Sequence, residues 1–448
     1  MMNKRSFLKL CSASAMTSFL SPLAVWASGG HLKNWAGNIE YSTEQLLDVD
    51  SLAQVQAFVE KTSKFKVLGT RHCFNNIADS RDEFLSLEKM DKVVALDTNA
   101  RTVTVAGRMK YGALAPYLDQ KGFALHNLAS LPHISIAGAC STGTHGSGEK
   151  NGNLSTSVSA LEFVNASGDV MKFSRKDNPD VFPGAVVALG ALGVITKVTL
   201  DVVPTFQMQQ YVYENLPLSE MKDHFDAIQS AAYSVSLFTD WKNKNINEVW
   251  LKCTMDQGKA YENNPDFFGA KKAMKNLHPI SGISAENCTE QMGIPGPWYE
   301  RLPHFKMGFT PSAGAELQSE FYVPRQHAVD AILAVERLNE HVSPLLLITE
   351  IRAIAADDLW MSPCYKQSSV TIHFTWKPDW PNVSKVLPMI ENALAPYHPR
   401  PHWGKLFTIP PSQLHAEYEK MPDFIKLAKQ FDPSGKFRNE FLNENLFG

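Results

Sequence analysis

The stretch VLGTRHCFN, residues 67–75, places His72 directly after an apolar, strand-like run that breaks at Gly69. A histidine in a short polar loop can fill a core position, bind a metal, act as a general base or carry a covalently attached group. The stretch by itself leaves all four roles open, so the rest of the chain must decide which chemistry His72 performs.

A second candidate is the stretch LASLPHISIAGACSTGTHGSG, residues 128–148, which is rich in glycine, serine and threonine. Glycines let a backbone approach a ligand closely, and exposed N–H groups in such stretches bind phosphate oxygens. The stretch has neither the strand–helix frame of a Rossmann fingerprint nor a P-loop sequence. It is either a long surface loop or a pyrophosphate site for a dinucleotide. We favour the second because loops this long are uncommon without a function.

Two predicted strands each carry one polar and one apolar face, because side chains alternate along a strand. They are LLLITEIR, residues 345–352, and VTIHFTW, residues 370–376. Their polar faces carry Ile348, Glu350 and Arg352, and Thr371, His373 and Thr375. These faces either contact water, the usual case in an antiparallel sheet, or line a site for a substrate with several hydroxyl groups.

The loop RPHWGK, residues 400–405, adds a third candidate group, Lys405. Pro401 and Gly404 restrict the backbone on either side of Trp403. Since a solvent-exposed position is by far the commonest for any single lysine, the loop alone assigns Lys405 no chemistry.

Length and composition exclude several classes of protein. A chain of 448 residues suggests two domains, and 20% charged with 44% hydrophobic residues is typical of a soluble protein. A net charge of −3 argues against nucleic acid as a partner. No stretch reaches the roughly 18 to 20 apolar residues of a membrane span. The cysteines show no C-x-x-C spacing and no H-E-x-x-H is present, so we predict no metal site and disfavour a zinc hydrolase.

Residues 1–27 predict an export signal, with Lys4 and Arg5 ahead of an apolar stretch that ends in AVWA. KRSFLKL is similar to a twin-arginine signal with lysine in the first basic position, and an ordinary secretory signal is the alternative. We expect a periplasmic or secreted protein. Five cysteines follow the signal, and one disulfide between an unassigned pair is compatible with export.

The remaining pattern predicts a mixed α+β fold without regular β-α-β alternation. Helices are expected over residues 50–61, 109–122, 324–340 (with Pro324 near its start) and 384–397, hairpins over 93–107 and 159–174, and a strand over 192–204. We predict a first domain over residues 28–205, a second over 206–404, and a C-terminal tail over 405–448 that packs back on the first.

These elements together resemble the flavoprotein oxidases of the vanillyl-alcohol-oxidase type, and closely the alditol (xylitol) oxidases. The matching motifs, in order, are NWAGN at 34–38, VLGTRHCFN, NLASLPHISIAGACSTGTHGSG, AAYSVSLFTDW, IPGPWYERLPHF, GAELQSEFYVPR, EIRAIAAD, HFTW and RPHWGK. The resemblance covers essentially the whole chain after the signal. It implies an FAD-binding domain of the PCMH type and an α+β substrate (cap) domain with an antiparallel sheet.

The resemblance also implies that FAD is bound covalently, through its 8α-methyl group, to His72. Such a tether retains the cofactor outside the cytoplasm and raises its reduction potential. Bicovalent relatives carry a cysteine where this chain has Leu131, so we expect one link. Cys73 stands where alditol oxidases commonly have serine, and Cys140 should be a small packed residue.

The remaining roles carried over from the family are these. Ser130 contacts flavin and substrate, Glu350 and Arg352 bind the alcohol, His373 and Thr375 contact substrate hydroxyls, Lys405 lies near the flavin N1 and the reacting hydroxyl, and Ala129 gates oxygen. The expected cofactor-binding set is Gly69, Thr70, Arg71, His72, Cys73, Phe74, Asn75, Ser130, Ser135, Gly138, Thr142, Gly143, Thr144, His145, Ile195 and His402.

The resemblance therefore implies a monomeric oxidase that converts a polyol to the aldose by hydride transfer to flavin N5, with oxygen reduced to hydrogen peroxide. Either Lys405 or His373 takes the hydroxyl proton. One alternative is a sugar-1,4-lactone oxidase or dehydrogenase on the same fold. Another, of a different class, is a non-catalytic periplasmic polyol-binding protein.

Overall fold

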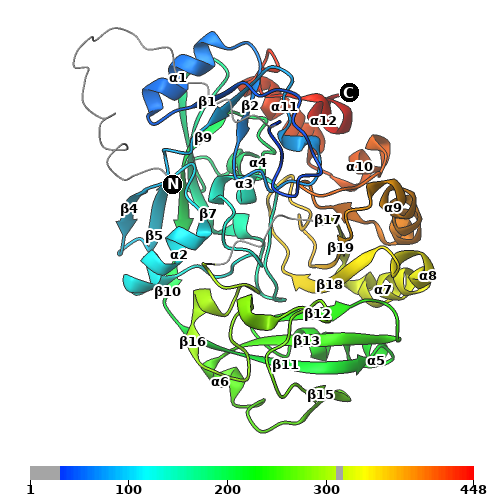
Figure 1. Ribbon diagram of the computed structural model, residues 1–448. Helices are drawn as coiled ribbons and strands as arrows, with labels where there is room; N and C mark the ends of the chain where they lie inside the picture. Colours follow the sequence, from blue (N-terminus) through cyan, green and yellow to red (C-terminus); the bar gives the residue numbers. More distant parts are fainter. Residues whose placement is uncertain (1–30, 309–315) are drawn as a thin grey trace, which may run out of the picture. The chain divides into compact units, whose positions relative to one another are not determined.

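The computed structural model describes residues 31–308 and 316–448. The predicted export signal lies outside these residues and stays a prediction. The chain from His31 onward forms one compact unit (Figure 1). Within the described part of the chain, no helix is both long and apolar enough to cross a membrane. The five cysteines in this part are all free thiols.

The first part of the fold holds a small parallel sheet in the order β1-β3-β2, formed by β1 (Leu46–Asp48), β3 (Glu83–Ser86) and β2 (Phe65–Leu68). Helix α1 (Leu52–Lys61) connects β1 to β2 and buries Val55, Phe58 and Val59. That i, i+3, i+4 spacing puts all three side chains on one face of the helix. Strand β2 ends at Leu68, and the His72 loop begins at the next residue.

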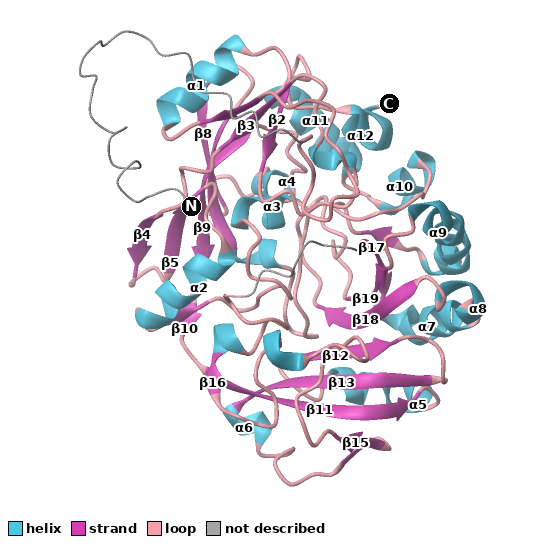
Figure 2. Cartoon of the chain, in the orientation of Figure 1, coloured by secondary structure: helices cyan, strands magenta, loops and turns pink. Residues whose placement is uncertain are grey.

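A five-stranded antiparallel sheet lies beside it (Figure 2). Its order is β4 (Val93–Asp97), β5 (Thr102–Ala106), β9 (Val194–Asp201), β7 (Val158–Val164) and β8 (Val170–Ser174). Both predicted hairpins are confirmed, β4–β5 and β7–β8. The connections hold α2 (Tyr111–Gln120), β6 (Phe123–Ala124), α3 (Ile136–Ser141), α4 (Phe182–Val186) and β10 (Val203–Pro204).

The second part is a ten-stranded antiparallel sheet in the order β14-β15-β11-β13-β12-β18-β19-β17-β20, with β16 paired to β11. Its strands are β11 (Gln207–Pro217), β12 (Ser234–Thr239), β13 (Asn245–Thr254), β14 (Asp266–Phe267), β15 (Ala270–Lys272), β16 (Gly296–Pro297), β17 (Leu317–Pro324), β18 (Leu346–Ile354), β19 (Ser369–Trp376) and β20 (Arg400–Pro401). Its helices are α5 (Glu220–Gln229), α6 (Met255–Gly258), α7 (Ala328–Glu336), α8 (Asn339–Val342) and α9 (Trp380–Leu394).

Two helix predictions in this part need correction. The single helix expected over 324–340 is wrong, because Pro324 is the last residue of β17 and the helices are α7 and α8. A proline is tolerated at a strand end, where no ladder hydrogen bond is lost. The helix expected over 384–397 begins earlier, at Trp380, with Pro381 in its first turn, where the missing N–H costs nothing.

The C-terminal segment contains α10 (Pro411–Glu417), α11 (Met421–Phe431), α12 (Glu440–Leu442) and a π-helical turn, Asn443–Phe447. It contacts the first sheet: Phe65 N–H donates to Lys436 O at 3.1 Å, and Lys66 Nζ donates to Phe437 O at 3.0 Å. The boundaries predicted near 205 and 404 fall in the connections β10–β11 and β20–α10, and they stay predictions.

Candidate active site

A cavity of about 260 Å³ lies between the His72 loop, the glycine-rich stretch and the polar face of the large sheet. The predicted site residues that line it are Gly69, Thr70, Arg71, His72, Cys73, Phe74, Ala129, Ser130, Ser135, Gly138, Thr142, Thr144, His145, Ile195, Arg352, His373, His402 and Lys405. Four other predicted residues, Asn75, Gly143, Glu350 and Thr375, do not line this cavity. The structure thus brings the candidates from three distant stretches to one place.

Backbone-directed hydrogen bonds hold the His72 loop on one side. Asn34 Nδ2 donates to Cys73 O at 2.8 Å, Asn38 Nδ2 donates to Phe74 O at 2.9 Å, and Trp35 N–H donates to Arg71 O at 2.7 Å. The motif NWAGN therefore holds the loop in place. Its two asparagine amides donate to loop carbonyl oxygens that lie outside any strand or helix.

On its other side the loop is tied to the segment that carries Lys405. Asn75 Nδ2 donates to Trp403 O at 2.9 Å and to Lys405 O at 2.6 Å, and Phe74 N–H donates to Gly404 O at 2.8 Å. Asn75 thus fixes the position of Lys405 relative to His72 without facing the cavity.

His72 is surrounded by rings. Its Nδ1 lies 3.3 Å from His133 Nε2, and its ring centroid lies 4.5 Å from that of Trp35. Burial, with His133 and Lys405 adding to it, lowers the pKa of His72 to about 3. The imidazole is therefore neutral at physiological pH and keeps one nitrogen lone pair, which an attacking nucleophile requires.

The glycine-rich stretch is a buried segment around the short helix α3, so the surface-loop alternative is wrong. Ser135 N–H donates to Thr70 Oγ1 at 3.3 Å, which joins the stretch to the His72 loop. A Cβ added at Gly138 or Gly69 would lie 2.8 Å or 3.1 Å from Ser135 Oγ. A side chain at either position would therefore crowd Ser135, so the two glycines let the His72 loop and the glycine-rich stretch pack together beside the cavity.

The polar faces predicted for β18 and β19 do line the interior, because both strands are almost entirely buried. A third strand, β17, completes the face, and its register pairs Glu320 with His373, which in turn pairs with Glu350. Paired residues in an antiparallel sheet project to the same side. Glu320 and Gln318 were not among the predicted site residues, although Gln318, Glu320 and Tyr322 alternate with Leu317 and Phe321 in the sequence.

Glu320 gathers three donors on one buried carboxylate. It accepts hydrogen bonds from Lys405 Nζ at 2.7 Å, Arg352 Nη2 at 2.8 Å and His145 Nε2 at 3.0 Å. Burial alone would raise the pKa of Glu320, but Lys405, His145 and Arg352 hold it well below its usual range. Burial lowers the pKa of Lys405 from its usual value, and the Glu320 carboxylate opposes that shift.

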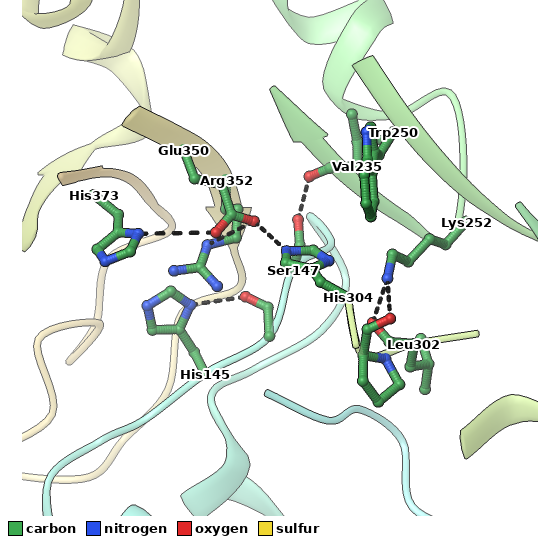
Figure 3. Close-up of polar contacts among 12 residues, drawn as sticks. His145, Ser147, Val235, Trp250, Lys252, Leu302, His304, Glu350, Arg352 and His373 are labelled. Carbon is green, nitrogen blue, oxygen red and sulfur yellow. Dashed lines mark hydrogen bonds and ion pairs between the residues drawn. The ribbon is translucent and has the colours of Figure 1, made fainter. Parts of the chain in front are cut away.

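Glu350 forms the second charged centre. Its Oε1 accepts from His304 Nε2 at 2.7 Å and lies 3.5 Å from Arg352 Nε, while its Oε2 lies 3.9 Å from His373 Nδ1 (Figure 3). Burial opposes ionisation, yet Arg352 and His304 hold the pKa of Glu350 well below its usual range. Glu350 is therefore ionised and supports Arg352 and His373 from behind the cavity lining.

His304 was not among the predicted site residues, although its motif IPGPWYERLPHF was. Its ring lies between Phe238 and Trp250, with centroids 5.5 and 5.3 Å away, and burial lowers its pKa to about 4. The backbone N–H of His304 donates to Ser130 O at 3.2 Å. His304 thus links Ser130 to Glu350, a long-range contact that no local pattern reveals.

Lys252 fixes the segment that precedes His304. Its Nζ donates to the carbonyl oxygens of Arg301, Leu302 and Pro303 at 2.9, 2.7 and 2.7 Å (Figure 3). The lysine is fully buried, so these three bonds replace the water that it loses.

Comparisons with known proteins agree with this geometry. A family model described as "FAD binding domain" matches residues 44–174, and one described as "D-arabinono-1,4-lactone oxidase" matches residues 315–445. A cholesterol oxidase from B. sterolicum shares the fold, with a TM-score of 0.71 over 93% of this chain and 96% of that chain, at 16% identity. The fold and the site define an FAD-dependent oxidoreductase of the vanillyl-alcohol-oxidase type.

Within that class, the chain is 44% identical to an alditol oxidase from Streptomyces sp., over 93% of this chain and 99% of the relative. It is 26% identical to an L-gulonolactone oxidase from Bos taurus, over 94% of this chain and 99% of the relative. The protein therefore belongs to the alditol oxidase family.

Proposed function

We propose that this protein oxidises a primary alcohol of a polyol, such as xylitol or sorbitol, to the aldose while oxygen is reduced to hydrogen peroxide. The observation that carries the proposal is the charge balance of the polar face, where Glu320 and Glu350 are matched by Arg352 and Lys405. A site without excess charge suits a neutral ligand. Its many donors and acceptors suit a ligand with several hydroxyl groups, and they disfavour analogues that leave them unpaired.

The cavity residues fit FAD. Gly69 and Gly138 line the cavity, and Thr70, Ser135, Thr142 and Thr144 offer hydroxyl and backbone donors suited to phosphates. FAD, when bound, supplies a two-electron acceptor for the hydride of the alcohol carbon. Lys405 places a positive charge in this cavity, where it stabilises negative charge on a bound ring.

We further propose that His72 carries FAD covalently through the flavin 8α-methyl group. The neutral state of the imidazole and its place in the cavity lining support this assignment. The tether would retain the cofactor in the periplasm or outside the cell, the location that the predicted signal over residues 1–27 suggests.

The experiment on the tether is acid precipitation of the purified protein. Yellow colour and flavin fluorescence are expected in the pellet, and His72→Ala should move both to the supernatant. His31→Ala is the matched control because His31 is exposed and does not line the cavity. Flavin in the wild-type supernatant would exclude the link at His72.

The remaining cavity residues take supporting roles in this proposal. Ser130 binds substrate hydroxyls, Arg352 orients the alcohol, and Ala129 controls the access of oxygen. Glu350 acts through Arg352 from outside the cavity lining, and the substrate contact of Thr375 stays a prediction. Ser130 is placed for its role by the hydrogen bond that its carbonyl accepts from His304.

The experiment on the substrate compares peroxide formation from xylitol, sorbitol and L-gulono-1,4-lactone. Polyols are expected to give the larger kcat/KM. A lactone oxidase or dehydrogenase is the second candidate, favoured by the lactone oxidase model that matches residues 315–445. Faster turnover of the lactone, or reduction of an artificial acceptor without peroxide, would favour it and contradict the polyol oxidase.

A further inference from the structure

His304 is bonded to two sides of the candidate site at once. Its backbone N–H donates to Ser130 O at 3.2 Å, and its ring Nε2 lies 2.7 Å from Glu350 Oε1 (Figure 3). Ser130 belongs to the glycine-rich stretch and lines the cavity, whereas Glu350 belongs to β18 of the large sheet. One residue therefore connects the two segments that bound the site, although it does not line the cavity itself.

The surroundings of the His304 ring determine which nitrogen donates. Arg352 and His304 hold the pKa of Glu350 well below its usual range, and an ionised carboxylate only accepts, so Nε2 carries the hydrogen. Nδ1 is buried near Phe238 and Trp250 and has no hydrogen-bond partner among the described residues. A second proton there would bury an unpaired N–H. The neutral ring thus orients Glu350 and leaves its negative charge for Arg352 Nε, 3.5 Å away.

Two buried side chains hold the segment that ends at His304, which forms neither helix nor strand. Lys252 Nζ donates to the carbonyl oxygens of residues 301–303 at 2.9, 2.7 and 2.7 Å. Thr289 Oγ1 donates to Pro303 O at 2.9 Å, and Thr289 N–H donates to His304 O at 2.9 Å. These donors satisfy backbone groups that no ladder pairs, so the backbone of His304 has a fixed position.

We propose that His304 is a positioning residue that sets the spacing between Ser130 and Arg352, and that Lys252 and Thr289 position His304 in turn. The backbone of His304 holds Ser130, and its ring aims Glu350, which orients Arg352. Both Ser130 and Arg352 line the cavity and bind the alcohol in the proposed function. The motif IPGPWYERLPHF thereby gains a role in substrate binding, although none of its residues lines the cavity. This deepens the proposed function and rests on it.

The direct test compares His304→Asn with His304→Gln in the holoenzyme. Both variants lose the ring, but the glutamine amide nitrogen reaches about as far as Nε2, whereas the asparagine amide ends near the place of Nδ1. Anaerobic reduction of the flavin at increasing xylitol concentration measures the Kd and the reduction rate separately. His304→Asn should raise the Kd roughly 10- to 100-fold, the effect of a lost hydrogen bond to a charged group, with a much smaller change in rate.

His304→Gln should restore a Kd close to that of the wild-type enzyme, because it keeps an N–H donor for Glu350. A wild-type Kd in His304→Asn would overturn the proposal. Equal losses in the two variants would overturn it too, because the reach of the donor would then be irrelevant.

Lys252→Met tests the support of the segment. The loss of three hydrogen bonds should raise the Kd for xylitol and speed hydrogen exchange in the peptide that contains His304, whose N–H is protected by Ser130 O. Thr289→Val loses only the hydroxyl bonds, should show a smaller change of the same kind, and serves if Lys252→Met does not fold. Unchanged exchange in both variants, followed by mass spectrometry, would contradict the proposal.

His415→Asn is the matched control. His415 Nε2 also donates a hydrogen bond, to Asn445 O at 3.0 Å, but it lies in α10 and does not line the cavity. This variant should leave the Kd and the exchange near His304 unchanged. Every variant is also measured with L-gulono-1,4-lactone. Reduction of the wild-type flavin by the lactone alone would refute the proposed substrate, and the comparison of His304→Asn with His304→Gln would then be decided on the lactone.

Discussion

The His72 loop and the polar face of the large sheet are held in place by different kinds of interaction. Around His72, neutral asparagine amides donate to backbone carbonyls. Across β17, β18 and β19, charged side chains bind one another, with Glu320 and Glu350 as acceptors. Removing a neutral hydrogen bond from the loop costs little more stability than that bond contributes. Removing one charged side chain from the polar face leaves its charged partners buried without a counter-charge. The two regions should therefore respond very differently to single substitutions.

The largest effect is expected for Glu320→Gln. Removing this charge leaves Lys405 and Arg352 buried together without their shared carboxylate, which should lower the free energy of unfolding by about 3–5 kcal/mol. Denaturant unfolding measures this directly. Glu391→Gln is the matched control, because Glu391 is also buried but accepts hydrogen bonds from uncharged donors, those of Thr408 and the backbone N–H of Ile409. Equal losses in the two variants would contradict the charge-network account.

A smaller effect is expected for Asn75→Ala in the loop. The variant loses the two hydrogen bonds that Asn75 donates to the carbonyls of Trp403 and Lys405 and the one that its Oδ1 accepts from Ile77 N–H, and should lose about 1–3 kcal/mol of stability. Its fraction of acid-stable flavin should fall, because Lys405 and His72 are no longer held together. Asn75→Asp should be worse than Asn75→Ala, since a carboxylate would face two carbonyl oxygens. The order of these two variants in denaturant unfolding is the decisive measurement.

The stability of the polar face should depend on pH through His304. The pKa of His304 is about 4 in the folded protein, below the ordinary value of 6.5, so its contribution is complete above pH 6.5 and is lost as the pH falls towards 4. The depressed pKa of Glu350 acts in the same direction at lower pH. His304→Phe should reduce the slope of unfolding free energy against pH between 4 and 6.5. An unchanged slope would contradict this assignment.

The smallest effect is expected for Cys73→Ser. Burial raises the pKa of Cys73 to about 12, so the thiol is not ionised at neutral pH. Turnover should change less than about twofold, and the native enzyme should resist iodoacetamide, because the thiolate is the reactive form. Rapid alkylation of Cys73, followed by mass spectrometry, would contradict this expectation.

Strand alternation explains why part of the site could be predicted. Glu350, Arg352 and His373 occupy alternate positions in apolar runs, and the period of two assigns them to one face. Glu320 shows the same alternation in β17. No strand was predicted there, because Pro324 was interpreted as the start of a helix. His304 and Lys252 could not be predicted from pattern, because their partners are fixed by contacts between distant residues and not by local period.

The bond from Lys66 to Phe437 has a consequence for how the protein is made. The two residues are 371 positions apart, and the same segment supplies the carbonyl that Phe65 binds. At about 5–20 residues per second, a ribosome needs roughly 20 to 75 seconds to make the chain between them. During that interval strand β2, which leads into the His72 loop, lacks its hydrogen-bond partners Lys436 and Phe437. Under the proposal that His72 carries FAD, the attachment would follow translation of residues 436–437.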